Sequence, residues 1–464
     1  MPRSRLKHLF LGVSAMKKSC LTLLASMVMV LLPVSLEAQW ARAYGGKGND
    51  EAACVQPTPD GGFIVVGTNA ACGIWVAKLG SSGKVIWQRT TADAGGEWLS
   101  GAFVQTTRDN GFVLTGRASW GMPRMGLLAW KLDANGNTRW QKYLIDPDQQ
   151  HNTAQEGSAV QPTSDGGHVF VGTQQYWNPQ MESRSKEDLL VFKTDSLGNI
   201  KWRVAAGGLD TDLGRSVQET PEGGFIVAGS TKSMGAGDHD YYVMKLKSNG
   251  GSDWDFAYGG PGEDQAREVR RTADGGYIVV GSTKSFGAGD YDVWLLKLGG
   301  KGKIVWQKTY GGAKADYGNS VYPASDGGLI VAGTTSSFGS GGFDAWVLKL
   351  DARGNVQWEK AYGGASHESL FSVRPLAGGG YVAAGRTRSF GVNAFDVLVL
   401  KLGQTGKIDP SCGTFVRATR AEVGKTSGTS VEDPGAGWPG QGLWVTVTFS
   451  LSDPRAANTV ICKK

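Results

Sequence analysis

One complete unit of an internal repeat lies between Trp306 and Trp358, and this stretch decides the fold. It reads WQKTYGG (306–312), NSVYPASDGGLIVAGTTSSFG (319–339) and FDAWVLKLDARGNVQ (343–357). Its four apolar segments are each about five residues long, which is the usual length of a short β-strand. Asp326-Gly327-Gly328 provides the positive φ angles of a tight hairpin, and residues 351–355 make a similar turn. The unit therefore predicts four antiparallel strands.

The same unit recurs along most of the chain. Its opening tryptophans are Trp40, Trp87, Trp140, Trp202, Trp254, Trp306 and Trp358, with spacings of 47, 53, 62, 52, 52 and 52 residues. Four short antiparallel strands, repeated seven times, are typical of an all-β, seven-bladed β-propeller with four-stranded antiparallel blades. A linear β-solenoid, with shorter repeats and parallel pairing, is the alternative. Pro410 stands where an eighth tryptophan would fall, so we expect the strand Trp40–Tyr44 to fill that slot and close the ring.

Composition and charge narrow the class of protein. The 464 residues include 70 glycines but only 16 prolines, and charged residues make up 19%, which excludes intrinsic disorder, collagen and coiled coil. The formal net charge of +6 is concentrated at the N-terminus: without residues 1–38, 43 basic side chains (48 − 5) face 41 acidic ones (42 − 1). A nucleic-acid-binding surface is therefore not expected.

The N-terminal segment has the features of a secretory signal. Met16-Lys17-Lys18 precedes the apolar run Leu21–Leu32, which is shorter than the roughly 20 residues that span a bilayer. We predict a signal peptide over residues 1–38, cleaved after Ala38. The mature protein would then be secreted (extracellular, cell surface or periplasmic) without a membrane span. An uncleaved anchor is the alternative.

The repeat predicts a propeller over residues 39–410, followed by a small C-terminal β appendage over residues 411–464. The appendage contains the alternating strand Leu443–Phe449. Four cysteines remain after the signal is removed, an even number that permits disulfides in an exported chain. We predict one bridge, Cys412–Cys462, within the appendage and a second, Cys54–Cys72, beside a shortened loop of the first unit.

Differences in length between the units point to one face of the propeller. The interval from the second-strand valine to the glycine that ends the third strand is always 12 residues, and that from the fourth-strand lysine to the next tryptophan is always 9. The other two connections vary, and because connections alternate between the ends of an antiparallel blade, both variable ones share one end. We call this end the variable face and the other the constant face. Ligand-binding residues concentrate on such loops. We therefore predict that the recognition surface is formed by Thr90–Gly101, Leu144–Gly157 and Gln174–Asp188. The alternative is that these longer loops only cover the surface and bind nothing.

The candidate ligand-binding residues lie in the loops where the second and third units depart from the repeat. They are Glu97, Trp98, His151, Tyr176, Trp177, Asn178 and Glu182, with Asp146, Asp148 and Gln180 nearby. An exposed aromatic ring beside carboxylates and amides suits a sugar- or peptide-binding patch. A loop tryptophan that packs back onto its own blade is the alternative.

Residues that recur in nearly every unit are expected to be structural. The repeated tryptophans should be packing anchors between strands or blades. The repeated acids, such as Asp264 and Asp292, should brace loops by accepting backbone N–H bonds, although the Gly-Ala-Gly-Asp-x-Asp stretches leave calcium binding open. No zinc, nucleophile-elbow or dinucleotide motif occurs, so we predict no catalytic residue, no metal and no cofactor.

Three phrases carry a resemblance to a known group of proteins. DGGFIVVG (60–67), DGGYIVVGSTKSFGAGDYDVWLLKL (274–298) and WQKTYGG (306–312) resemble the propeller repeats of secreted bacterial surface proteins, some of which are labelled endoglucanase-like. The Lys-Leu-Asp-x-x-Gly-x-x-x-Trp spacing at Lys131–Trp140 is similar to the tryptophan-docking repeat of quinoprotein propellers. The adjacent cysteines that quinone-cofactor enzymes use are absent, so that cofactor is not carried over.

Three hypotheses on function follow. The first is an exported, monomeric, non-catalytic propeller that binds a glycan or protein, or acts as a scaffold, at the bacterial cell envelope or outside the cell. The alternative is a carbohydrate-active enzyme, an endoglucanase-like glycoside hydrolase whose loop carboxylates act as acid and base. A module that only spaces other proteins is a third reading.

Overall fold

The computed structural model describes residues 39–69, 73–91, 98–119, 125–145, 153–176, 186–391 and 394–408, together with seven short strands between 416 and 462. The chain separates into two units, Met1–Glu37 and Ala38–Lys464, and all described residues lie in the second. Within these ranges no helix is long and apolar enough to cross a lipid bilayer.

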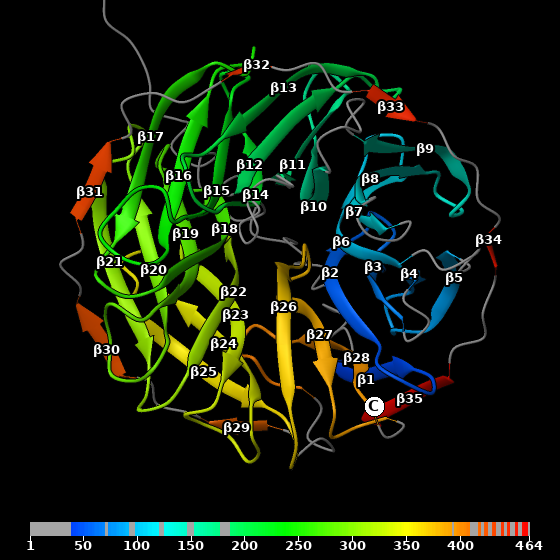
Figure 1. Cartoon of the computed structure of the whole chain (residues 1–464). Coiled ribbons are helices and arrows are strands. Elements are labelled where there is room, and N and C mark those ends of the chain that lie inside the picture. The colour runs from blue at the N-terminus through cyan, green and yellow to red at the C-terminus, as the bar shows by residue number, and fades with distance from the viewer. Residues whose placement is uncertain are drawn as a thin grey trace, which may run out of the picture. The chain divides into compact units, whose positions relative to one another are not determined.

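The propeller has seven blades of four antiparallel strands each, arranged in a ring (Figure 1). From the innermost strand outward, blade 1 is β2 (Glu51–Pro57), β3 (Phe63–Thr68), β4 (Ile74–Leu79) and β5 (Val85–Thr91); blade 2 is β6 (Trp98–Thr106), β7 (Phe112–Ser119), β8 (Met125–Leu132) and β9 (Thr138–Ile145). Blade 3 is β10 (Thr153–Pro162), β11 (His168–Tyr176), β12 (Lys186–Thr194) and β13 (Ile200–Ala206); blade 4 is β14 (Asp212–Glu219), β15 (Phe225–Thr231), β16 (Asp240–Leu246) and β17 (Ser252–Gly259). Blade 5 is β18 (Asp264–Arg271), β19 (Tyr277–Thr283), β20 (Asp292–Leu298) and β21 (Ile304–Gly311); blade 6 is β22 (Asp316–Pro323), β23 (Leu329–Thr335), β24 (Asp344–Leu350) and β25 (Val356–Tyr362). Blade 7 is β26 (Glu368–Pro375), β27 (Tyr381–Thr387), β28 (Asp396–Leu402) and β1 (Trp40–Gly45).

Blade 7 closes the ring in the predicted way. Its outermost strand, β1, comes from the N-terminal end of the propeller and pairs antiparallel with β28, from Trp40 opposite Lys401 to Tyr44 opposite Val397. Both the seven-bladed fold and the closure by the strand Trp40–Tyr44 are therefore confirmed.

The hydrophobic core is divided among the seven interfaces between adjacent blades. Each interface holds its own cluster of buried side chains. In β19, Tyr277 and Val279 face blade 4, whereas Ile278 and Val280 face blade 6. The middle strands are apolar at successive positions because both faces of each blade are covered. Each fully buried valine, leucine or isoleucine contributes about 1.5–3 kcal/mol to stability.

Each repeated tryptophan packs against the glycine turn of the next blade. The indole Nε1 of Trp254 donates to the carbonyl of Gly300 (3.3 Å), and its ring lies where a Cβ on Gly302 would come within 3.0 Å. Equivalent bonds to the next turn are made by Trp40, Trp87, Trp140, Trp202 and Trp358. Because Trp40 of blade 7 bonds Ser81 of blade 1, this docking continues across the closure. The predicted role of these tryptophans as packing anchors is confirmed.

A β-bulge interrupts every innermost strand, two residues before its valine. In β18 the register shifts between Ala266 and Glu268, which leaves Arg267 as the extra residue. Opposite the bulge, a Cβ on Gly281 would lie 1.9 Å from the carbonyl oxygen of Gln265. This close approach explains why every unit has glycine at this position.

The C-terminal segment runs around the outside of the ring. Its seven strands are β29 (Val416–Ala418), β30 (Glu422–Lys425), β31 (Thr429–Glu432), β32 (Trp438–Pro439), β33 (Leu443–Val445), β34 (Leu451–Ser452) and β35 (Ala457–Cys462). Each pairs antiparallel with the outermost strand of a different blade, in the order 6, 5, 4, 3, 2, 1, 7. The segment, shown in orange and red in Figure 1, adds a fifth strand to every blade.

The expectation of a separate small appendage over residues 411–464 is therefore wrong, since its seven described strands belong to seven different sheets. The physical reason is that each four-stranded blade ends in an open edge, whose unpaired N–H and C=O groups favour a further strand. Cys462 ends β35, which pairs with β1. Cys412 lies outside the described residues, so the Cys412–Cys462 bridge stays a prediction.

A lysine–aspartate pair recurs on the constant face. Lys297 Nζ donates to Asp274 Oδ1 (3.0 Å) and to the carbonyl of Leu298 (3.2 Å), and Thr272 Oγ1 donates to the same carboxylate (2.6 Å). The equivalent pairs are Lys78–Asp60, Lys131–Asp109, Lys193–Asp165 and Lys349–Asp326. Burial alone would raise the pKa of Asp274, but the bonds from Thr272 and Lys297 outweigh it and lower that pKa to about 2.

These carboxylates should make stability fall in acid. Asp60, Asp109, Asp165 and Asp274 each have a pKa near 2, below the ordinary 3.8, so their contribution is fully present above about pH 4 and is lost as the pH falls toward 2. Each pair should contribute less than about 1 kcal/mol, because the aspartates are largely exposed. Urea unfolding at pH 5, 4, 3 and 2 measures the decline. Asp274→Asn should flatten it slightly, and a stability that does not change between pH 4 and pH 2 would contradict the expectation.

Candidate functional site

The strand pairing places the constant and variable connections at opposite ends of the blades. In blade 5, Tyr277 pairs with Arg271 and with Leu298, and Leu298 pairs with Ile304, so both constant hairpins lie at one end. At the opposite end Thr283 pairs with Asp264 and with Asp292. The variable face deduced from loop lengths is thus a single end of the propeller.

Two of the candidate residues fall on described strands of this face. Trp98 is the first residue of β6, opposite Ser119, and Tyr176 is the last residue of β11, opposite Thr153. They mark the variable ends of adjacent blades 2 and 3. The remaining candidates lie outside the described residues: Glu97, His151, Trp177, Asn178 and Glu182, together with Asp146, Asp148 and Gln180.

The sequence analysis missed one exposed apolar side chain on the same face. Leu209 lies in the connection between blades 3 and 4 and is 96% exposed. Single exposed leucines are common on protein surfaces. Leu209 is a candidate only because it lies on the variable face, in the connection that leaves blade 3, the blade of Tyr176.

The repeated acids of the variable face are loop braces, as predicted. Asp264 accepts bonds from Gly260 N (2.9 Å) and Ser285 Oγ (2.7 Å), and Asp240 accepts from Ala236 N (2.9 Å). Burial, reinforced by the neighbouring Asp264, raises the pKa of Asp240 to about 6 despite these backbone bonds. Both carboxylates are 0% exposed, and within the described ranges no group of three or more acids, histidines or cysteines could hold a metal ion.

The innermost strands also carry polar side chains that the sequence analysis passed over. An innermost strand has an open edge, and side chains of the preceding blade accept bonds from its free N–H groups. Val269 N donates to Ser216 Oγ (3.2 Å), and Val373 N donates to Ser320 Oγ (3.1 Å). One step further on, Arg271 N donates to Gln218 Oε1 (2.7 Å). The serine before the valine and the glutamine after it therefore cap the inner edge of the next blade.

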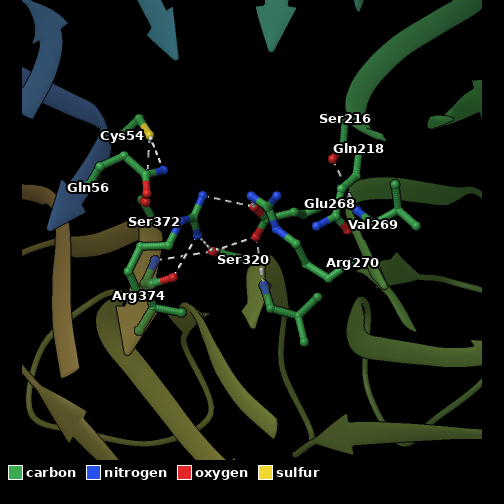
Figure 2. Close-up of polar contacts among 12 residues, drawn as sticks. Cys54, Gln56, Ser216, Gln218, Glu268, Val269, Arg270, Ser320, Ser372 and Arg374 are labelled. Atoms are coloured by element: carbon green, nitrogen blue, oxygen red, sulfur yellow. Dashed lines mark hydrogen bonds and ion pairs between the residues drawn. The ribbon is translucent and has the colours of Figure 1, made fainter. Parts of the chain in front are cut away.

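Blades 5 and 7 replace these neutral caps with charged residues, which gather at the centre of the ring (Figure 2). Glu268 occupies the serine position, and Arg270 and Arg374 occupy glutamine positions. Glu268 Oε1 accepts from Arg270 and from Arg374 Nη2 (3.0 Å), while its Oε2 accepts from Ser320 Oγ (2.6 Å) and the backbone N of Val321 (2.9 Å). We call Glu268, Arg270 and Arg374 the central triad.

The central triad is almost wholly buried and strongly coupled. Its members are 2–4% exposed. Burial alone would raise the pKa of Glu268, but the two guanidinium groups outweigh it and hold that pKa below its usual value. Both arginines lie over the ring of Tyr322, each 5.3 Å from its centroid. Comparing the residues on either side of the second-strand valine across the units would have revealed this departure from the repeat.

Cys54 lies on β2, the innermost strand of blade 1, and its state shows that one predicted disulfide is wrong. It is a free, buried thiol, so the Cys54–Cys72 bridge is not formed. Cys54 stands at the register of Ser320 and Ser372, where a side chain faces the neighbouring blades rather than a loop. Its Sγ donates to the carbonyl of Val104 (3.6 Å) and accepts from Ser372 Oγ (3.9 Å). Cys72 lies outside the described residues.

Together these features define a seven-bladed β-propeller with docked tryptophans, a charged centre and a fifth strand on each blade. No known family model matches the chain. Regulatory protein FlaEY of Caulobacter vibrioides is 29% identical over 235 residues, which make up 48% of this chain and 22% of that protein. The chain thus aligns with about a fifth of that relative's length.

The chain is also similar, at low identity, to solved structures, among them these two. A mutant puromycin hydrolase is 14% identical, with a TM-score of 0.43, over 80% of this chain and 54% of that one. The Pan2 WD40 domain of Neurospora crassa is 9% identical, with a TM-score of 0.36, over 67% of this chain and 91% of that one. Such distant likenesses say nothing about function.

Proposed function

We propose that this protein is an exported, non-catalytic binding or scaffold propeller that recognises a glycan or protein partner with its variable face. The observation that carries the proposal is that all variation in loop length falls at one end of a ring whose other end is constant. Loops held by a rigid frame are the usual place for recognition. The similarity of one segment to a protein named as regulatory fits a binding role better than a catalytic one.

Export is part of the same proposal. The segment 1–38 has the charge and apolar pattern of a secretory signal. Cleavage after Ala38 would leave β1 intact, since that strand begins at Trp40. The mature protein would therefore keep the strand that closes the ring. We expect it to act as a monomer at the cell envelope or outside the cell.

The binding proposal is tested with a panel of polysaccharides and envelope proteins. Trp177→Ala, in the inserted loop of the third unit, and Leu209→Ala should each weaken retention of the bound ligand at least tenfold, since each removes apolar contact area. Leu197→Ala is the matched control, because Leu197 is 65% exposed but lies in the constant turn between β12 and β13. Equal retention by all three variants would contradict recognition by the variable face.

The same panel distinguishes binding from hydrolysis. The buried acid pairs of the described loops, such as Asp240 and Asp264, are 0% exposed and cannot reach a polysaccharide. A hydrolase would instead use exposed acids of the variable face, such as Glu97 and Glu182 of the inserted loops. Release of reducing sugars that stops in Glu97→Gln or Glu182→Gln would replace the binding proposal with the enzymatic one.

A further inference from the structure

The variable face carries a second departure from uniform repetition, in the blades without inserted loops. The residue six positions before the fourth-strand lysine is aromatic or histidine in four consecutive units: His239, Tyr291, Phe343 and Phe395. In the first three units the same register holds Cys72, Met125 and Glu187. Each of the four directly precedes a bracing acid, as Tyr291 precedes Asp292, which pairs with Thr283 at the variable end of blade 5.

Backbone hydrogen bonds hold these residues where one blade meets the next. The carbonyl of Tyr291 accepts from the N–H of Asp316 (2.7 Å), and the carbonyl of Phe343 accepts from the N–H of Glu368 (2.7 Å). Asp316 and Glu368 begin β22 and β26, the innermost strands of the following blades. The blade frame itself therefore fixes where Tyr291 and Phe343 lie on the variable face.

Two further residues join these positions into a continuous line of side-chain rings across blades 5, 6 and 7. The ring centroids of Tyr291 and Tyr317 are 5.0 Å apart, those of Tyr317 and Phe343 are 6.2 Å apart, and those of Phe343 and His367 are 5.8 Å apart. These are contact distances for aromatic pairs. We call Tyr291, Tyr317, Phe343 and His367 the aromatic row.

The aromatic row is not part of the packed core. All four of its residues are half-buried, so solvent reaches part of each. The tyrosines that the repeat uses for packing are instead fully buried: Tyr258, Tyr310 and Tyr362. Tyr317 stands at a register where the neighbouring units have Gln265 and Ser369, so the blade does not need an aromatic ring there. Neighbouring apolar groups left at a surface mark an interaction site.

Hydrogen-bonding groups of both charges flank the blade 5 end of the aromatic row. Lys284 Nζ lies 4.4 Å from the centroid of the Tyr291 ring and pairs with Asp290 (3.5 Å). The hydroxyl of Tyr291 donates to the carboxylate of Glu263. A base and two acids thus surround the first ring of the row.

The blade 7 end has the same character. The N–H of Arg388 donates to the carbonyl of His367 (2.8 Å), and its guanidinium carbon lies 5.9 Å from the centroid of the Phe395 ring. Arg386 lies over the same ring (4.4 Å) and pairs with Glu51 (3.1 Å). Acids accompany the bases at both ends of the row, so a ligand without net charge fits this surface best.

We propose that the aromatic row binds a neutral glycan chain, whose sugar units lie along the rings from blade 5 to blade 7. A sugar ring has an apolar C–H face and hydroxyl groups around its rim, which match aromatic rings flanked by polar groups. A stable protein interface instead has a broad apolar core. The inference rests on the proposed function, since it names a ligand class and a binding site for the variable face.

The ligand class is tested by isothermal titration calorimetry of the purified protein. The probes are the neutral sugars cellohexaose, xylohexaose and chitohexaose, each compared with its disaccharide, and the anionic hexagalacturonate. At least one neutral hexasaccharide should bind, about tenfold more tightly than its disaccharide, because a chain contacts successive rings. Equal affinity for the disaccharide, or tighter binding of hexagalacturonate, would overturn the proposal.

The site is tested by substitution within the row. Tyr317→Ala and Phe343→Ala should each weaken binding of that hexasaccharide about tenfold, since each removes a stacking surface. Tyr317→Phe keeps the ring and should bind as the wild type does. Phe256→Ala is the control for lost stability, because Phe256 is also half-buried but lies on the outermost strand β17, beside the constant turn at Gly302. If Phe256→Ala weakens binding as much as Tyr317→Ala does, the row is not the site.

The outcomes separate this inference from the proposed function. If Trp177→Ala abolishes glycan binding while Tyr317→Ala and Phe343→Ala do not, recognition by the variable face stands and the aromatic row is excluded as the site. A wild type that retains an envelope protein but no neutral glycan overturns the choice of ligand alone. A wild type that retains neither overturns both.

Discussion

Glu268→Ala is expected to destabilise the propeller by about 3–5 kcal/mol, because it leaves two buried guanidinium groups without their shared carboxylate. The same substitution removes the acceptor of the Ser320 hydroxyl and of the Val321 N–H. Urea unfolding of the wild type and the variant at pH 7 measures the loss. The carboxylate of Glu268 is charged at this pH, since its pKa lies below the usual value.

Glu222→Ala is the matched control. Glu222 also pairs with a basic residue, Lys245 (3.4 Å), but its side chain is 63% exposed. A surface pair of this kind contributes no more than about 1 kcal/mol. If Glu268→Ala costs no more than Glu222→Ala, the central triad does not stabilise the ring.

A triple variant separates the effect of charge from that of shape. Glu268→Ser, Arg270→Gln and Arg374→Gln together restore the neutral residues found at these registers in other blades, such as Ser216 and Gln218. Those residues accept backbone N–H bonds of the next blade. The triple variant should therefore recover most of the lost stability, because replacing a whole buried ionic group is often neutral.

Truncation after Pro410 is expected to produce a folded propeller that aggregates and melts roughly 5–10 °C lower. It removes the fifth strand from every blade and leaves seven open edges. At two of them the lost pairing covers five residues of β1 and four of β17. Open edges are templates for pairing between molecules. The ring should still form, since β1 and β28 close it without the C-terminal segment.

The comparison is made by light scattering and thermal unfolding against a chain that ends at Cys462 and so keeps all seven strands. Adding a peptide of residues 411–464 to the truncated protein should reduce the aggregation. A truncated protein that stays monodisperse with an unchanged melting temperature would show that the C-terminal strands do not protect the blade edges.

The position of the variable face could be deduced from the sequence, because loop length is counted directly along the chain. Fixed and variable connections alternate, and an antiparallel blade sends them to opposite ends. The side chains of that face could not be deduced in the same way. Whether a tryptophan such as Trp177 turns outward or back onto its blade depends on packing that loop length does not specify.

The repeat by itself determined the seven four-stranded blades, the closure by Trp40–Tyr44, the docking tryptophans and the bracing acids. Each of these follows from contacts within one unit or between adjacent units, so a 52-residue period encodes them. Only the tertiary structure decided the path of the C-terminal strands, the free thiol of Cys54 and the central triad. In these cases the partners are distant in sequence, as Glu268 and Arg374 are, and they meet because the ring brings the inner or outer edges of its blades together.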